Sequence, residues 1–217
     1  MRWLWVVALS AEAAPLIAML RDPRPQRDGT WAGGFGDDAV NLLVCGVGPR
    51  AAHRRTRTLL QGGSFDAALN LGTCGALRDD LPIGQVVTAC AVRREGDHLA
   101  ALSGLGTHPA VHIATVRRPV WSSDARALLA ATGADVCEME LAGVWRAIQE
   151  TSPGLPLMAL KVVSDRAGAE VDGAVGARGL WAPIQVARFK LRALHLCHQH
   201  LAPAVLSALA APTSETP

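Results

Sequence analysis

The stretch Leu42-Leu-Val-Cys-Gly-Val-Gly-Pro-Arg-Ala51 reads as a buried strand that turns sharply into a helix. Its first four residues are apolar without alternation, which is typical of a strand covered on both faces. Gly46 and Gly48 let the backbone turn tightly and approach another group closely. A helical pattern over residues 49–61 follows. The stretch therefore predicts a strand–turn–helix unit of an α/β protein.

Short apolar runs alternate with longer helical patterns along the rest of the chain. We expect strands over residues 2–9, 40–45, 66–71, 84–92, 110–117, 134–138 and 156–163, and helices over 11–20, 49–61, 123–131, 139–150 and 183–210. The segment 21–36 is rich in Pro and Gly and is predicted to be a loop or an edge hairpin around Trp31. This order predicts a three-layer αβα fold of the α/β class, with helices flanking a central mixed, mostly parallel sheet. Because no domain boundary is visible, residues 1–217 are expected to form a single domain.

The composition excludes several classes of protein. Half of the 217 residues are hydrophobic and 18% are charged, which indicates a buried core rather than disorder. A net charge of +2 and 4% aromatic residues argue against a nucleic-acid partner, and we interpret Arg50, Arg54, Arg55 and Arg57 as the solvated face of a helix. The start of the chain resembles a first strand more than a signal peptide, and no apolar run approaches the ~20 residues of a membrane span. We therefore expect a cytoplasmic protein.

The cysteines and histidines give no pattern typical of a metal site. The five cysteines are odd in number and none forms a C-x-x-C pair, so neither a disulfide framework nor a zinc ribbon is expected. In the cluster His195-Leu-Cys-His198-Gln-His200, two histidines share a helix face, but no third ligand with a known spacing accompanies them. We expect this cluster on a helix surface, and we expect no metal and no cofactor.

The glycine turn also fits a dinucleotide-binding fingerprint. Gly46-Val-Gly48-Pro-Arg-Ala51 matches G-x-G-x-x-G/A, and Asp66 lies 20 residues beyond Gly46. The acidic residue of that fingerprint ends a strand, whereas Asp66 comes before its strand and so at the opposite edge of the sheet. A nicotinamide-dependent oxidoreductase is therefore a disfavoured alternative.

Polar side chains stand where several predicted strands end. They are Glu12, Thr73, Glu138, Glu140, Ser164 and Asp165. In open α/β sheets ligands bind at the carboxyl ends of the strands. Carboxylates gathered there are costly to desolvate unless they meet a ligand, a cation or a proton. Each acid alone has a structural explanation, such as a helix-terminus charge or an ion pair with Lys161, but their shared placement indicates a site.

Together these motifs resemble the purine nucleoside phosphorylase and nucleosidase superfamily, most closely its small nucleosidases acting on methylthioadenosine and S-adenosylhomocysteine. The resemblance lies in Ala8-Leu-Ser-Ala-Glu12, Cys45-Gly-Val-Gly-Pro-Arg-Ala-Ala52, Asn70-Leu-Gly-Thr-Cys-Gly-Ala76, Val136-Cys-Glu-Met-Glu140 and Val162-Val-Ser-Asp165. It runs in order from about residue 4 to residue 166. The M-E and S-D pair is fairly specific, whereas the glycine motif alone is weak.

The resemblance implies a role for each matching residue. Asp165 is expected to protonate purine N7, and Glu12 is expected to polarise the attacking water. Glu140 is expected to hold the ribose hydroxyls. The remaining substrate-binding positions are Met139 against the sugar, Thr73 beside the water or ribose, Ser164 of the S-D pair, Val47 of the glycine turn and, on position alone, Trp121 against the base.

The same resemblance implies a hydrolase acting on a small-molecule nucleoside, and a homodimer. Asn70 stands where phosphorylase members have a phosphate-binding Arg, and Glu12 occupies the turn that holds another, which argues against an anionic nucleophile. Lys161 replaces an Arg usual in the family, which puts the hold on Glu140 in doubt. The alternatives are a phosphate-dependent phosphorylase, a short-form relative acting on adenosylhopane or futalosine, and a non-catalytic nucleoside-binding relative.

Overall fold

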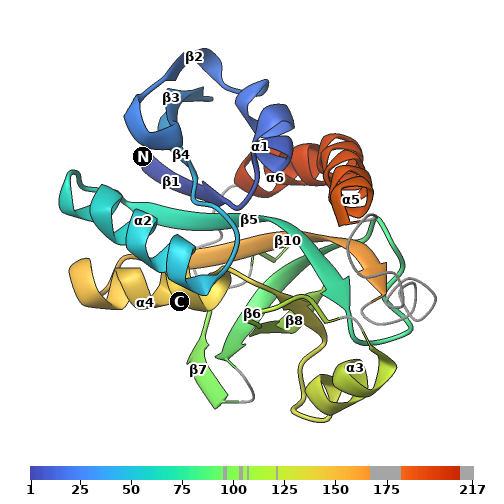
Figure 1. Cartoon of the computed structure of the whole chain (residues 1–217). Helices are drawn as coiled ribbons and strands as arrows, with labels where there is room; N and C mark the ends of the chain where they lie inside the picture. The colour runs from blue at the N-terminus through green and yellow to red at the C-terminus, as the bar shows by residue number, and fades with distance from the viewer. Residues whose placement is uncertain (95–96, 103–104, 107, 121, 167–181, 211–217) are drawn as a thin grey trace.

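A computed structural model describes residues 1–217 except 95–96, 103–104, 107, 121, 167–181 and 211–217 (Figure 1). Its elements, in chain order, are β1 (Arg2–Val7), α1 (Ser10–Ile17), β2 (Arg21–Pro25), η1 (Arg27–Gly29), β3 (Thr30–Phe35), β4 (Asp38–Val44), α2 (Pro49–Gln61), β5 (Ala67–Ala76), β6 (Val86–Arg94), β7 (Asp97–Ala101), β8 (Ala110–Thr115), α3 (Ser123–Ala130), β9 (Val136–Glu138), α4 (Leu141–Thr151), β10 (Leu157–Arg166), α5 (Ala182–Leu196), the π-helical turn η2 (Cys197–Leu201) and α6 (Ala202–Ala210).

The described strands join one sheet that closes on itself at one end. The order β10-β6-β8-β9-β5 is completed by a further pairing between β10 and β5, so these five strands form a ring. From β5 the sheet continues through β1 and β4 to the hairpin of β3 and β2 at its edge. This hairpin confirms the edge hairpin predicted for residues 21–36. The ring matters because it carries polar residues of β5, β9 and β10 to one place.

Helices cover the sheet on both faces, as predicted. Side chains of β1 alternate between two apolar cores: Leu4 and Val6 pack into one, and Trp3, Trp5 and Val7 into the other. The first core contains residues of α2 and α4, which lie side by side (Figure 1). The second contains residues of α1, η2 and α6. Burial on both faces explains why the strand sequences are apolar without alternation.

Strand direction differs from the expectation of a mostly parallel sheet. Five pairings are parallel and five are antiparallel among the described strands. The central strands β4, β1, β5 and β10 are mutually parallel, whereas β9 runs antiparallel to β5 and β6 runs antiparallel to β10. These reversals close the ring, and apolar runs contain no sign of strand direction.

Two strands are longer than predicted. β5 continues through Thr73 to Ala76, and β10 continues through Ser164 and Asp165 to Arg166. Thr73, Ser164 and Asp165 therefore lie within strands and not after them. Gly72 and Gly75 interrupt the apolar run of β5, but the backbone there keeps pairing with β10. Among the residues described, no helix combines the length and the apolar character that crossing a membrane requires.

Candidate active site

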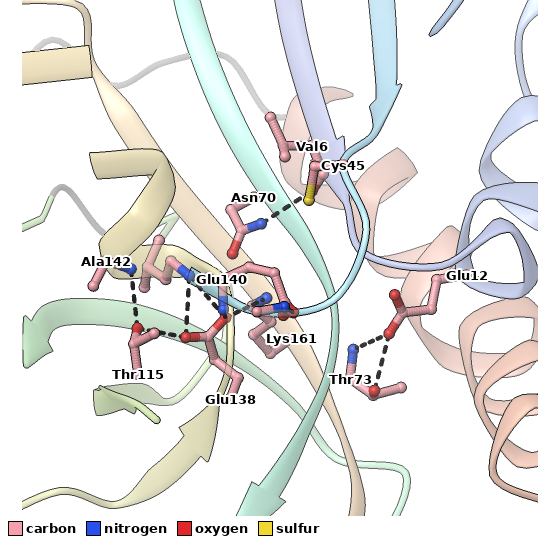
Figure 2. A network of polar contacts seen from close by, with 12 residues as sticks. Val6, Glu12, Cys45, Asn70, Thr73, Thr115, Glu138, Glu140, Ala142 and Lys161 are labelled. Atoms are coloured by element: carbon pink, nitrogen blue, oxygen red, sulfur yellow. Dashed lines mark hydrogen bonds and ion pairs between the residues drawn. The ribbon is translucent and has the colours of Figure 1, made fainter. Parts of the chain in front are cut away.

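The fold brings Glu12, Glu138 and Glu140 near one another and places Asp165 on β10 opposite Gly75, two residues beyond the Thr73 that contacts Glu12. Glu12 is on α1, Glu138 ends β9, Glu140 directly precedes α4, and Asp165 is on β10. The charges of Glu12 and Glu138 both raise the pKa of Glu140, as expected for side chains that share one site. Figure 2 shows Thr73 facing Glu12, and Glu138 between Thr115 and Lys161.

Glu12 is fixed by three hydrogen bonds. The backbone N–H and the hydroxyl of Thr73 each donate to Glu12 Oε1 at 2.9 Å, and the N–H of Leu9 donates to Oε2 at 3.1 Å. The side chain is 3% exposed. Gly72 makes this approach feasible, because its φ is +141° and a Cβ there would lie 2.9 Å from Glu12 Oε1. The carboxylate of α1 is thus held against β5 in one orientation.

Glu138 is the centre of a buried polar clamp. Its carboxylate accepts hydrogen bonds from the Thr115 hydroxyl at 2.6 Å, the Glu140 N–H at 2.8 Å and the Leu141 N–H at 2.9 Å. Lys161 Nζ, 1% exposed, donates to it at 3.2 Å. Carboxylates suit a helix start because unpaired N–H groups point outward there. Glu138 therefore fixes the beginning of α4 and, with it, the backbone of Glu140.

Glu140 has far fewer partners than Glu138. Its Oε1 accepts a hydrogen bond at 2.8 Å from the N–H of Gly48, which belongs to the glycine turn before α2. Lys161 hydrogen-bonds Glu138 and not Glu140, so the hold on Glu140 that the sequence left in doubt is made by Gly48. Burial, followed by the charge of Glu138, raises the pKa of Glu140 to about 8. The Glu140 side chain can accept a hydrogen bond from a ligand hydroxyl, and it accepts more strongly once it has lost its proton.

The charges of the site do not balance. Glu12, Glu138 and Glu140 are buried with Lys161 as the one buried Lys or Arg in the described part of the chain. Burial lowers the pKa of Lys161, but Glu138, Glu140 and Glu12 together outweigh this effect and raise it. Lys161 therefore stays charged. With a pKa of about 8, Glu140 is largely protonated at neutral pH, so the site holds the carboxylates of Glu12 and Glu138 around one ammonium. The remaining excess of negative charge favours a cationic group in the site.

Ser164 and Asp165 occupy an irregular step in β10. The pairing with β5 passes from Val163 opposite Cys74 to Asp165 opposite Gly75, so Ser164 is an extra residue. Such bulges redirect side chains. The buried Ser164 hydroxyl lies 2.5 Å from Asp165 Oδ1 and 3.2 Å from the carbonyl oxygen of Cys74. Asp165 is half-buried, which leaves it partly accessible to a ligand.

The other predicted positions are arranged as follows. Met139 is half-buried between the two acids of its motif, and Val47 is exposed on the glycine turn. Trp121 lies outside the described residues. Asn70 is buried and donates to the carbonyl of Val6 at 3.1 Å, so the position occupied by a phosphate-binding Arg in phosphorylases is here a neutral structural contact. Thr115, which contacts Glu138, belongs to no motif and was not predicted from the sequence.

Cofactor and metal sites receive no support from the described residues. Asp66 accepts the N–H of Arg2 at 2.7 Å at the amino-terminal end of β5, on the far edge from Glu12, as the sequence predicts. His195, His198 and His200 are exposed, and no group of three potential metal ligands occurs in the part of the chain that the structure describes.

Comparison with known proteins agrees with this fold. None of the curated proteins matches the sequence. A methylthioadenosine/S-adenosylhomocysteine nucleosidase from S. pneumoniae shares 22% identity with a TM-score of 0.75, over 96% of this chain and 100% of that chain. The corresponding Helicobacter pylori nucleosidase shares 17% with a TM-score of 0.78, over 96% and 97% of the two chains. A futalosine hydrolase mutant from Helicobacter pylori shares 16% with a TM-score of 0.77, over 96% and 98%.

The TM-scores of 0.75, 0.77 and 0.78 establish a common fold with these structures. A family model described as the phosphorylase superfamily also matches residues 5–111. The family model matches the first half of the sequence, and the solved structures share the fold over nearly the whole chain. Both findings confirm the resemblance to the phosphorylase superfamily that the sequence motifs indicate.

Proposed function

We propose that the protein is a nucleosidase that hydrolyses the N-glycosidic bond of an adenine-type purine nucleoside, such as methylthioadenosine or S-adenosylhomocysteine, and releases the free base. The observation that carries this proposal is the excess of buried carboxylates around one ammonium. Cleavage of a glycosidic bond makes the sugar cationic in the transition state, and fixed negative charge in a buried site stabilises that cation.

Water is activated at Glu12 in this mechanism. The Thr73 hydrogen bonds hold Oε1, and a carboxylate so oriented accepts a proton from a water molecule on the sugar side. As the water oxygen bonds to the anomeric carbon, the bond from that carbon to the base nitrogen breaks. Glu12 therefore supplies the general base.

The departing base takes its proton from Asp165. Protonation of the purine at N7 neutralises the charge that the breaking bond leaves on the base. The Ser164 hydroxyl next to Oδ1 orients the acid. Glu140 accepts hydrogen bonds from the ribose hydroxyls, and Met139 packs against the sugar. The Glu138 clamp keeps Glu140 in position.

Water fits this site better than phosphate. A phosphate beside Glu12 meets a fixed carboxylate, and Asn70 supplies no positive charge to compensate. Both arguments concern charge, which affects binding strongly in a site from which water is excluded. The phosphorylase therefore remains the second candidate, distinguished by its product.

The test is product analysis with and without phosphate. We expect the free base, the free sugar or its 5′ derivative, and a rate that phosphate does not change. A sugar 1-phosphate as the main product would identify a phosphorylase, and no base release from a panel of purine nucleosides would favour a non-catalytic binding protein.

Glu12→Gln provides the residue-level check. Since Gln keeps the size but cannot accept the proton, we expect kcat to fall at least ~10²-fold with little change in KM. A circular dichroism melt confirms that the variant is folded. A near-normal kcat would remove Glu12 from the mechanism. The homodimer expected from the resemblance stays a prediction that light scattering of the purified protein tests.

A further inference from the structure

A basic cavity lies beside Glu140, outside the carboxylate site. Its volume is about 600 Å³, and its walls are the glycine turn from Val47 to Ala51 and the start of α4 at Ala142 and Gly143. Five basic side chains also line it: Arg50, His53, Arg94, Arg117 and Arg146. No carboxylate is among the described residues that line it. The cavity therefore has the opposite charge from the neighbouring site.

Two of these arginines have no acidic partner in the described part of the chain. Arg146 pairs with Glu150 at 2.9 Å, and His53 contacts the same carboxylate at 2.8 Å. Arg50 at the start of α2 and Arg94 at the end of β6 form no ion pair there. Arg94 is nevertheless half-buried. Guanidinium groups gathered around a cavity repel one another, and a bound anion relieves that repulsion.

The cavity adjoins the proposed ribose position. Gly48 lines it and donates its N–H to Glu140 Oε1. If Glu140 holds the 2′ and 3′ hydroxyls and Asp165 faces the base, the 5′ carbon lies at the end of the sugar away from Asp165. We place that end toward the glycine turn, because Gly48 contacts Glu140 and Val47 beside it is 51% exposed.

We propose that this cavity is a subsite for an anionic group, a carboxylate or a phosphate, on the 5′ substituent of the nucleoside. The proposal rests on the proposed function for the placement of the sugar. Guanidinium groups suit such anions because they donate paired hydrogen bonds to two oxygens at once. The first turn of α2, which has no side-chain cap, adds N–H groups of the same polarity.

The same charges do not make the cavity a site for an attacking phosphate. In the proposed mechanism the nucleophile reaches the anomeric carbon from the side of Glu12 and Thr73, and neither of these residues lines the basic cavity. The cavity therefore determines which nucleoside binds and leaves the nucleophile unchanged. An increase of rate with free phosphate together with a sugar 1-phosphate product would overturn this assignment.

The test compares two synthetic nucleosides that differ in one charge. They are 5′-deoxy-5′-(2-carboxyethylthio)adenosine and its neutral analogue 5′-deoxy-5′-propylthioadenosine, and adenosine 5′-phosphate serves as the phosphate probe. We expect kcat/KM for the carboxylate compound to exceed that for the neutral one by about 10- to 100-fold at low salt, the range of a charge-assisted contact. The advantage should shrink as salt is added.

Arg94→Gln and Arg50→Gln should reduce this advantage severalfold without changing turnover of the propyl compound. Arg54→Gln is the matched control: it removes a guanidinium from the same helix, but Arg54 lines a different cavity with Arg2 and Arg55. Equal rates for the two compounds, or a preference that Arg94→Gln does not alter, would overturn the subsite while leaving the nucleosidase intact.

If neither compound is cleaved, the proposed function fails and binding decides the subsite. A tryptophan fluorescence titration would then support the subsite if the carboxylate compound binds more tightly than the propyl compound and loses this difference in Arg94→Gln. Equal binding of the two compounds would overturn it.

Discussion

Glu138 and Glu140 are two residues apart and chemically identical, yet their surroundings assign them different tasks. Glu138 accepts hydrogen bonds from a hydroxyl, two backbone N–H groups and Lys161, so its oxygens are occupied. The Glu140 side chain accepts a hydrogen bond only from the Gly48 N–H among the described residues. Glu138 therefore holds the backbone at the start of α4, whereas the Glu140 side chain can still accept hydrogen bonds from a ligand.

Glu138→Gln should therefore destabilise the fold. The amide cannot balance the charge of Lys161, which is buried, and breaking a buried ion pair on one side costs about 3–5 kcal/mol. Urea denaturation at pH 7 measures the loss. A change below about 1 kcal/mol would show that Glu12 and Glu140 suffice to balance Lys161.

Gly72→Ala should disturb both stability and catalysis. A left-handed backbone alone costs a non-glycine residue roughly 1–2 kcal/mol, and the methyl group would also displace the Glu12 carboxylate. We expect an additional loss of about 1–3 kcal/mol and a lower kcat.

Gly154→Ala is the control for the backbone effect. Gly154 has φ of +97° with nothing within 4 Å of an added Cβ. The difference between the two variants isolates the contact with Glu12. Equal melting temperatures and full activity in Gly72→Ala would mean that Glu12 is free to move away.

The bulge in β10 positions Asp165, the proposed acid. Asp165→Asn should lower kcat ~10²–10⁴-fold, because an amide cannot protonate the base, while the melting temperature stays close to that of wild type. Ser164→Ala should cost less, since it removes only the hydroxyl that contacts Asp165. Activity of Asp165→Asn within about threefold of wild type would contradict the assignment.

The sequence predicted the order of helices and strands and the residues that gather at the site, because apolar runs and polar strand ends are local signals. It did not predict β7, the ring or the Thr115 contact of the clamp, although it offered an ion pair of Lys161 with one of the acids, which the Lys161–Glu138 pair bears out. Closure requires β9 to run against β5, and apolar residues favour burial equally in either direction. Thr115 is 23 residues from Glu138, and no local pattern joins them.

At the scale of the whole molecule, strands between Arg2 and Arg166 share one sheet, which supports our proposal that residues 1–217 form a single domain. The basic cavity adjoins the acidic site through Gly48, which lines the cavity and donates its N–H to Glu140, so groups of opposite charge lie close together. In water such charges are strongly screened, but in a buried site they persist and determine which ligands fit.

The stability of the ligand-free protein should depend on pH through Glu140. Its pKa is about 8 in the folded state against an ordinary value of 4.5, so the folded state binds the proton more tightly than the unfolded chain. The resulting stabilisation is complete below about pH 4.5 and is lost as the pH rises through about 8. Melting temperatures between pH 5 and 9 record this loss.

Glu140→Gln should remove most of this dependence. Gln keeps an oxygen for the Gly48 N–H but carries no charge, so the variant should match wild type near pH 5 and exceed its stability by about 2–4 kcal/mol at pH 9. It should also lose nucleoside binding, seen as a raised KM, because an amide accepts hydroxyl donors less well than a carboxylate. A variant that is less stable than wild type at pH 9 would mean that Glu140 is stabilised by partners other than Gly48 and Lys161. If Glu140→Gln is instead more stable at pH 9 and binds the nucleoside more weakly, the charge of Glu140 lowers the stability of the fold and contributes to ligand binding.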